Sequence, residues 1–155
     1  MIALALVRHA KSDWGDAALD DHDRPLSARG LRDAPVMARR LVDDGFLADV
    51  VLSSTALRAR TTAGYFAAAF ELTARLEERL YGAPPSVILK AAAESGASSV
   101  VVVAHDPGMS ALAGRLSGRI AHMPTCAVAT FTWDEDDWSV VDALEPLTWT
   151  FDTPR

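Results

Sequence analysis

Apolar positions along the chain follow two different patterns, and their alternation indicates the fold class. Residues 2–7, 49–52 and 99–103 are short, mostly aliphatic runs, typical of strands buried on both faces of a parallel sheet. Between them, apolar residues recur at helical spacing in residues 31–42, and residues 56–70 and 86–94 supply two further helices. This alternation predicts an α/β fold: a three-layer sandwich with a mostly parallel central sheet and helices on both faces.

The C-terminal part of the chain has a strand pattern instead. Residues 127–133 and 138–143 predict two strands joined by the acidic turn 134–137, which would form a hairpin at the sheet edge. Earlier in the chain, Pro35 either kinks the first helix or marks a start one turn later than Ser27 suggests. We find no linker or internal repeat, so we expect one domain that spans residues 1–155.

Charge and composition narrow the class of partner. The net charge of −6 disfavours a nucleic-acid surface, because phosphate backbones are bound by clustered Lys and Arg. No apolar run approaches the length of a membrane span, and the N-terminus lacks the basic segment of a secretion signal. Cys126 is the only cysteine, which is consistent with a reducing compartment. We therefore expect a cytoplasmic protein without nucleic-acid or membrane partners; its oligomeric state stays open.

Polar side chains follow each of the three predicted buried strands. Ligands of open α/β sheets bind outside the carboxyl ends of the strands, so we expect these segments to share one crevice. They are Arg8 and His9 after the first strand, Ser53, Ser54, Thr55 and Arg58 after the second, and His105 and Asp106 after the third.

The predicted crevice would suit a dianion. Arg8 and Arg58 carry planar, permanently charged forks that match phosphate or carboxylate oxygens. Ser54 or Thr55 is expected to cap the helix that carries Arg58. Another helix is expected to begin near Met109, so two helix N-termini would face the ligand.

Two histidines beside these arginines indicate a reaction. The ordinary histidine pKa of about 6.5 makes the neutral and charged forms of His9 and His105 both accessible near pH 7. Neutral His9 would attack phosphorus and take the phosphoryl group. Arg8, Arg58 and a protonated His105 would stabilise the equatorial oxygens, and water would then hydrolyse the phosphohistidine. This scheme requires no metal and no other cofactor, because the guanidinium groups supply the positive charge.

Three segments of the chain carry a family resemblance. VRHAKS, SSTALRARTT and VVAHDPGMS resemble the motifs of the histidine phosphatase superfamily, which includes the phosphoglycerate mutases. The short chain and the stretch DDHDRPLSARG are similar to the small SixA-type phosphohistidine phosphatases, and the resemblance spans about residues 2–118. It implies that His9 is the phosphorylated nucleophile and that Arg24 contacts phosphate or substrate at the rim. Arg8, Arg58 and His105 would complete the phosphate pocket.

The chain departs from the family pattern at two points. Ala10 stands where the signature usually has Gly, a change that we expect to be tolerated if φ is negative there. The general acid is open: Glu78, in LEERLYG, resembles the position used by many relatives, and Asp106 occupies the position used by the acid phosphatase branch. A phosphohistidine substrate would need neither, because a protonated nitrogen leaves readily.

Other notable side chains have simpler expected roles. Residues 20–23 are interpreted as a solvated acidic loop rather than a metal site, and His122 as structural. Cys126 has Thr132 six residues later and therefore lacks the Arg that cysteine phosphatases require. Lys11 is placed at the pocket rim. The tryptophans Trp133, Trp138 and Trp149 are assigned to core or edge packing.

These observations predict a phosphatase that acts on the phosphohistidine of a phosphotransfer protein. The short connections between strands leave little material for a lid, which favours a phosphate presented on a protein surface. One alternative is a phosphomonoesterase for a small phosphorylated metabolite. Another is a non-catalytic module that binds phosphorylated ligands through the same arginines. The presence of both His9 and His105 favours an enzyme, since binding alone would need only the cations.

Overall fold

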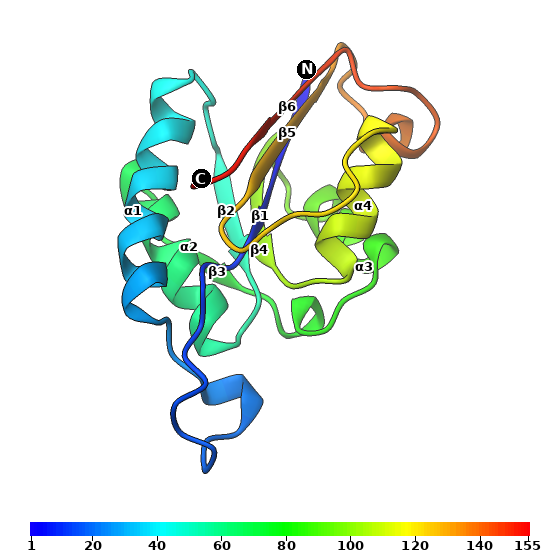
Figure 1. Cartoon of the computed structure of the whole chain (residues 1–155). Helices are drawn as coiled ribbons and strands as arrows, with labels where there is room; N and C mark the ends of the chain where they lie inside the picture. Colours follow the sequence, from blue (N-terminus) through cyan, green and yellow to red (C-terminus); the bar gives the residue numbers. More distant parts are fainter.

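The computed structural model describes residues 1–155 and is built around one six-stranded sheet (Figure 1). Its strands are β1 (Ile2–Arg8), β2 (Val50–Ser53), β3 (Arg75–Leu76), β4 (Ser99–Ala104), β5 (Val128–Trp133) and β6 (Thr148–Asp152). They follow the order β3-β2-β4-β1-β5-β6 across the sheet. The β1–β4, β2–β4 and β2–β3 pairs are parallel, and β5 is antiparallel to both β1 and β6. The predicted α/β fold with a mostly parallel sheet is confirmed.

Helices cover both faces of this sheet, as predicted. The helices α1 (Ala28–Asp43) and α2 (Leu57–Ala69) lie on one face, and α3 (Pro85–Ala93) and α4 (Gly108–Ser117) lie on the other (Figure 1). Three short 3₁₀ helices complete the elements: η1 (Asp21–Asp23), η2 (Glu78–Leu80) and η3 (Trp138–Asp142). None of these helices combines the length and the apolar character that crossing a membrane requires.

The central strand β1 is buried on both faces, which explains its unbroken apolar sequence. Successive strand side chains point to opposite faces, so Leu4 and Leu6 pack against α3 and α4, whereas Ala5 and Val7 pack against α1 and α2. Full burial of one large aliphatic side chain contributes about 1.5–3 kcal/mol. This packing fixes the carboxyl end of β1, where Arg8 and the following histidine are located.

Helix α1 begins at Ala28, directly after Ser27, so the alternative of a start one turn later is wrong. The hydroxyl of Ser27 accepts a hydrogen bond from Gly30 N at 3.2 Å and holds the first turn. A Cβ on Gly30 would lie 2.2 Å from the Lys11 carbonyl oxygen, so only glycine allows this approach of α1 to the chain that leaves β1. Pro35 lies inside the helix, where buried Ala34 packs against the sheet.

The edge hairpin exists, but its second strand is β6 and not residues 138–143. Those residues form η3, because the Asp137 carboxylate accepts from Ser139 N at 2.9 Å and Trp138 Nε1 donates to the Ala97 carbonyl at 2.8 Å. Val141 is thereby turned into the core. The sheet edge is formed instead by β6, in which threonines alternate with half-exposed Trp149 and other apolar side chains.

Candidate active site

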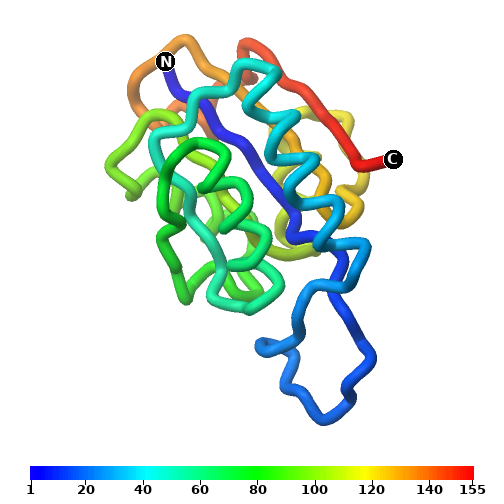
Figure 2. Tube along the Cα trace, turned by 90° about the vertical axis from the view of Figure 1, so that its left-hand side faces the viewer, coloured from blue at the N-terminus to red at the C-terminus, as the bar shows by residue number.

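The carboxyl ends of β1, β2 and β4 meet at one end of the sheet, as predicted. The ring centroids of His9 and His105 lie 5.1 Å apart, and His105 Nε2 lies 2.7 Å from the hydroxyl of Ser54. All three side chains are buried. Residues 12–25 project from the body at this end as the blue segment at the bottom of Figure 2. The site is therefore assembled by three neighbouring strands and one long connection.

The His9 imidazole is held in one orientation. Its Nδ1 lies 2.8 Å from the carbonyl oxygen of Ala10, and because a carbonyl can only accept, Nδ1 carries the proton. The lone pair is then on Nε2, which makes no hydrogen bond. Ala10 N in turn donates to Thr62 Oγ1 at 3.0 Å. The only non-glycine residues with positive φ are Glu71 and Cys126, so the condition for tolerance of Ala10, a negative φ, is met.

Burial favours the neutral form of both histidines. Burial lowers the pKa of His9 to about 4, and the charges of Arg58 and Arg8 act in the same direction. Burial, followed by the neighbouring His9, lowers the pKa of His105 to about 3. The protonated His105 expected from its ordinary pKa is therefore not the resting form. A bound dianion would raise both pKa values, because an adjacent negative charge favours imidazolium.

Arg8 is held by the loop before β5 and by the start of α4. Its Nη1 donates to the Met123 carbonyl at 2.9 Å and lies 3.6 Å from Asp106 Oδ2. The Asp106 carboxylate accepts hydrogen bonds from Ser110 N at 2.9 Å and from Ser110 Oγ at 2.7 Å. The buried Nε of Arg8 has no hydrogen-bond partner, so one donor of its guanidinium group makes no hydrogen bond. His122, interpreted as structural, is exposed, and its Nδ1 lies 3.6 Å from Asp106 Oδ2.

Arg58 is held by the projecting segment instead. Its Nη1 donates to the Asp21 carbonyl at 2.6 Å and its Nη2 to Asp21 Oδ2 at 2.9 Å. Asp21 also accepts from Tyr81 OH at 2.6 Å and from Arg24 Nη1 at 2.7 Å. The Tyr81 hydrogen bond, followed by those of the two guanidiniums, holds the pKa of Asp21 well below its usual range. Residues 20–23 are largely exposed, as expected, but Asp21 in addition binds Arg58, Arg24 and Tyr81.

Arg24 is buried and largely occupied by the segment around it. Besides Asp21, it donates to the Ser12 hydroxyl and, through Nε at 3.3 Å, to the Asp13 carbonyl. Its Cζ lies 3.2 Å from the ring centroid of Trp14, which is a cation–π contact. These contacts give Arg24 a part in ordering the projecting segment, and its contact with substrate stays a prediction.

Tyr81 and Asp21 are the site neighbours that sequence reasoning missed. The Tyr81 ring centroid lies 5.5 Å from that of His105 and 4.9 Å from that of His22, edge to face in both cases. His22 Nε2 lies 2.8 Å from Thr55 Oγ1. The available signal for Tyr81 was its place in LEERLYG, the segment already singled out for an acidic side chain.

The two candidate general acids lie in different surroundings. Glu78, the first residue of η2, is exposed, and its carboxylate makes no hydrogen bond or ion pair. Asp106 is beside Arg8 as described above. The expectation that Ser54 or Thr55 caps α2 is wrong, because Ala56 occupies the cap position without a side-chain hydrogen bond. Helix α4 begins at Gly108, close to the expected start.

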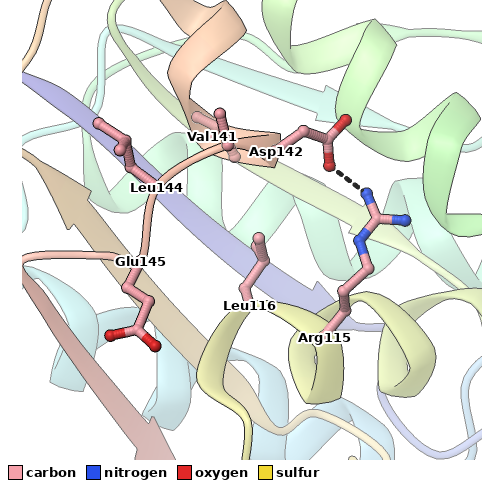
Figure 3. Close-up of a pocket in the computed structure, with 7 residues that line it drawn as sticks. Arg115, Leu116, Val141, Asp142, Leu144 and Glu145 are labelled. Atoms are coloured by element: carbon pink, nitrogen blue, oxygen red, sulfur yellow. Dashed lines mark hydrogen bonds and ion pairs between the residues drawn. The ribbon is translucent and has the colours of Figure 1, made fainter.

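Other parts of the molecule offer no comparable chemistry. No three His, Cys, Asp or Glu side chains form a group that could hold a metal ion. Burial raises the pKa of the Cys126 thiol to about 12. A cavity of about 220 Å³ between α4 and η3 contains an ion pair of Arg115 with Asp142, while Glu145 points elsewhere (Figure 3). This cavity has no histidine, serine or cysteine, and its one arginine is paired with Asp142, so we assign the candidate reaction to the carboxyl end of the sheet.

Comparison with known proteins agrees with this assignment. The model of the histidine phosphatase superfamily (branch 1) matches residues 4–83, which is more than half of the chain. An uncharacterized protein from Mycobacterium tuberculosis (strain H37Rv) is 41% identical over 109 residues, or 69% of this chain and 67% of that protein.

Two solved structures resemble the whole fold. A SixA protein from Agrobacterium tumefaciens gives a TM-score of 0.77 at 29% identity, with 84% of this chain and 90% of that chain covered. The protein histidine phosphatase SixA, solved in complex with tungstate, gives a TM-score of 0.72 at 28% identity, with 98% and 95% covered.

Proposed function

The chain belongs to the histidine phosphatase superfamily (branch 1) and is a phosphatase, and we propose that it works through a phosphohistidine intermediate on His9. The observation that carries this proposal is the state of the His9 ring. It is neutral, its Nδ1 proton is bound to the Ala10 carbonyl, and its Nε2 lone pair is left for a substrate. Neutral imidazole with a fixed tautomer is the form that attacks phosphorus.

The proposed reaction has two displacement steps at phosphorus. In the first, His9 Nε2 forms a bond to phosphorus while the bond to the leaving atom breaks, and the leaving group takes that electron pair and a proton. In the second, a water oxygen attacks phosphorus and the Nε2–phosphorus bond breaks. The pair of electrons returns to Nε2, the water's protons go to phosphate and solvent, and His9 is regenerated.

Charge stabilisation is assigned to three other side chains. Arg8 and Arg58 would bind the equatorial phosphoryl oxygens with their guanidinium groups, and His105 would donate to an oxygen once the dianion has raised its pKa. These three groups reach the site from three strand ends, which favours an arrangement set before substrate binds. Arg24 is proposed as an outer contact. No metal is required, and Asp106 or Glu78 would serve as proton donor only for a leaving group that needs one.

The proposed substrate is a phosphohistidine on a phosphotransfer protein. The two related structures are SixA proteins, one of them a protein histidine phosphatase in complex with tungstate, which is an oxyanion of phosphate-like shape. The connections that follow β2 and β4 are short and leave little material for a lid, which supports a phosphate presented on a protein surface. The long connection at this end, residues 12–25, contacts Arg58 through Asp21. We also infer that residues 1–155 act as one domain, and that its location is cytoplasmic, consistent with its lone cysteine.

A substrate panel tests this proposal. Turnover of a phosphohistidine-bearing protein is compared with turnover of small phosphorylated metabolites, using the wild type, His9→Ala and Arg60→Ala. Arg60 is exposed and lies two residues beyond Arg58 on the same helix, so its substitution is a control for loss of positive charge. We expect the highest kcat/KM on the phosphoprotein, near-complete loss in His9→Ala and little change in Arg60→Ala.

The possible outcomes separate the parts of the proposal. Comparable turnover by His9→Ala would overturn the nucleophile assignment. A preference of the wild type for one small phosphoester would overturn the substrate class and indicate a phosphomonoesterase. Stoichiometric binding of phosphate without turnover on any substrate would contradict catalysis altogether. Thermal unfolding of each variant checks that it is folded.

A further inference from the structure

One serine outside the proposed pocket links both groups that hold Arg8. Ser110, in the first turn of α4, donates through Oγ to Asp106 Oδ2 at 2.7 Å and through its backbone N to Asp106 Oδ1 at 2.9 Å. The same Oγ accepts a hydrogen bond from Met123 N at 2.8 Å. One hydroxyl therefore ties the carboxylate beside Arg8 to the segment whose carbonyl Arg8 binds.

The two groups that Ser110 joins are the same two groups that contact Arg8. Its Nη1 has two fixed neighbours, the Met123 carbonyl at 2.9 Å and Asp106 Oδ2 at 3.6 Å, and both belong to residues that Ser110 holds. Met123 lies in the long connection between α4 and β5, with no helix or strand of its own. Without the Ser110 hydroxyl, this connection and the Asp106 carboxylate would be joined only through Arg8 itself and through the exposed His122, whose Nδ1 lies 3.6 Å from Asp106 Oδ2.

The surrounding structure fixes the position of Ser110 itself. A Cβ on Gly108 would lie 2.1 Å from the Ala83 carbonyl oxygen, so glycine permits the close contact that places the first turn of α4. Met109 and Leu112, on either side of Ser110, are fully buried in the core. Ser110 is thus on a rigid element, whereas the groups it orients lie on connections.

We propose that Ser110 is a positioning residue for Arg8: its hydroxyl sets the geometry of the guanidinium that binds the phosphoryl group. This inference rests on the proposed function, in which Arg8 contacts that group. Ser110 itself would not touch the substrate. We expect phosphate binding to weaken about tenfold, or by about 1.4 kcal/mol, when the hydroxyl is removed.

The experiment measures the Kd of inorganic phosphate and the kcat/KM for substrate in Ser110→Ala, Ser110→Thr and Ser117→Ala. Ser117 is a matched control: it lies on the same helix, is equally half-buried, and its hydroxyl bonds only the end of α4 and the following turn. We expect Ser110→Ala to raise the Kd of phosphate and to lower kcat/KM, each about tenfold. Ser110→Thr should have values close to those of the wild type, and Ser117→Ala should leave both unchanged.

A double-mutant cycle with Arg8→Ala shows whether Ser110 acts through Arg8. In the Arg8→Ala background, we expect Ser110→Ala to cause no further loss, because the group that it positions is absent. Additive losses would overturn the proposal, as would wild-type phosphate binding by Ser110→Ala or an equal loss in Ser117→Ala. If the wild type neither binds phosphate nor turns over substrate, the proposed function fails, and that result is distinct from a Ser110 effect.

Discussion

The two arginines of the proposed phosphate clamp are supported in different ways. Arg8 donates to the main-chain carbonyl of Met123 and lies beside the Asp106 carboxylate, which also accepts a hydrogen bond from the first turn of α4. Its buried Nε has no hydrogen-bond partner. Both terminal nitrogens of Arg58 are bound to one residue, Asp21, in the segment that projects from the body (Figure 2). One arginine is thus supported by buried connections that pack beside α4, and the other by an exposed connection.

This difference separates what the fold provides from what the projecting segment provides. The Asp106 carboxylate is mostly buried, at 17% exposure, whereas that of Asp21 is 49% exposed. Ion pairs at exposed positions contribute little to global stability, because solvent screens the charges. We therefore infer that the Arg8 side is a property of the folded core, while order on the Arg58 side depends on the local state of residues 12–25.

Replacing either arginine is expected to have the largest effect on activity. Arg8→Ala and Arg58→Ala are each expected to lower kcat/KM about 10³-fold, because each removes a charged donor set from the transition state. Steady-state kinetics on the phosphoprotein substrate measure the effect, with Arg60→Ala as the control. If only one substitution reduces activity, the clamp consists of a single arginine and the comparison fails.

The histidines between the two sides predict a pH dependence of stability. Their pKa values of about 4 and about 3 lie below 6.5, so the unfolded chain binds protons that the native protein does not. Stability should therefore fall as the pH drops from about 6.5 toward 4, by up to about 4 kcal/mol between pH 7 and pH 5.

Urea unfolding at pH 7 and pH 5 measures this loss, and His105→Asn should remove about half of it. The depressed pKa of Asp21 acts in a separate window, below about pH 4, where protonation of that carboxylate would also reduce stability. Equal stability of the wild type at pH 5 and pH 7 would contradict burial of two neutral imidazoles.

Replacing the two carboxylates gives a smaller and more selective test. Asp106→Ala should lower the free energy of unfolding by about 1–2 kcal/mol, because the first turn of α4 loses its side-chain acceptor. Asp21→Ala should lower it by less than about 1 kcal/mol. Its main effect should be faster amide hydrogen exchange within residues 12–25, since Arg24, Arg58 and Tyr81 lose a shared partner. The reverse order of stability losses would overturn the assignment of core and peripheral support.

The strand ends and the clamp were predictable because each depends on a local pattern. Continuous apolar runs identified the strands, and parallel pairing brings their carboxyl ends to one edge, which placed Arg8, His9, Arg58 and His105 together. The fold class follows from the same pattern. To bring these four side chains together, it was enough to know that the carboxyl ends of parallel strands lie at one edge of a sheet. No long-range contact had to be predicted.

The missed features depend on contacts between distant segments. Asp21 meets Arg58 across 37 positions and Tyr81 across 60, and nothing in an acidic tetrapeptide predicts those partners. The second strand of the hairpin was misplaced because the side chains of residues 138–143 suit both a strand and a 3₁₀ helix anchored by Trp138. The neutral state of the histidines likewise follows from burial, which only the packed structure reveals.

Detection of the covalent intermediate tests the central claim most directly. The protein is mixed with ³²P-labelled phosphohistidine protein, quenched within milliseconds and digested, and the labelled peptide is identified. We predict an acid-labile, base-stable label on the peptide that contains His9, at a level that decays as phosphate is released, and none in His9→Ala. Turnover by the wild type without any labelled His9, or with the label on another residue, would contradict the account.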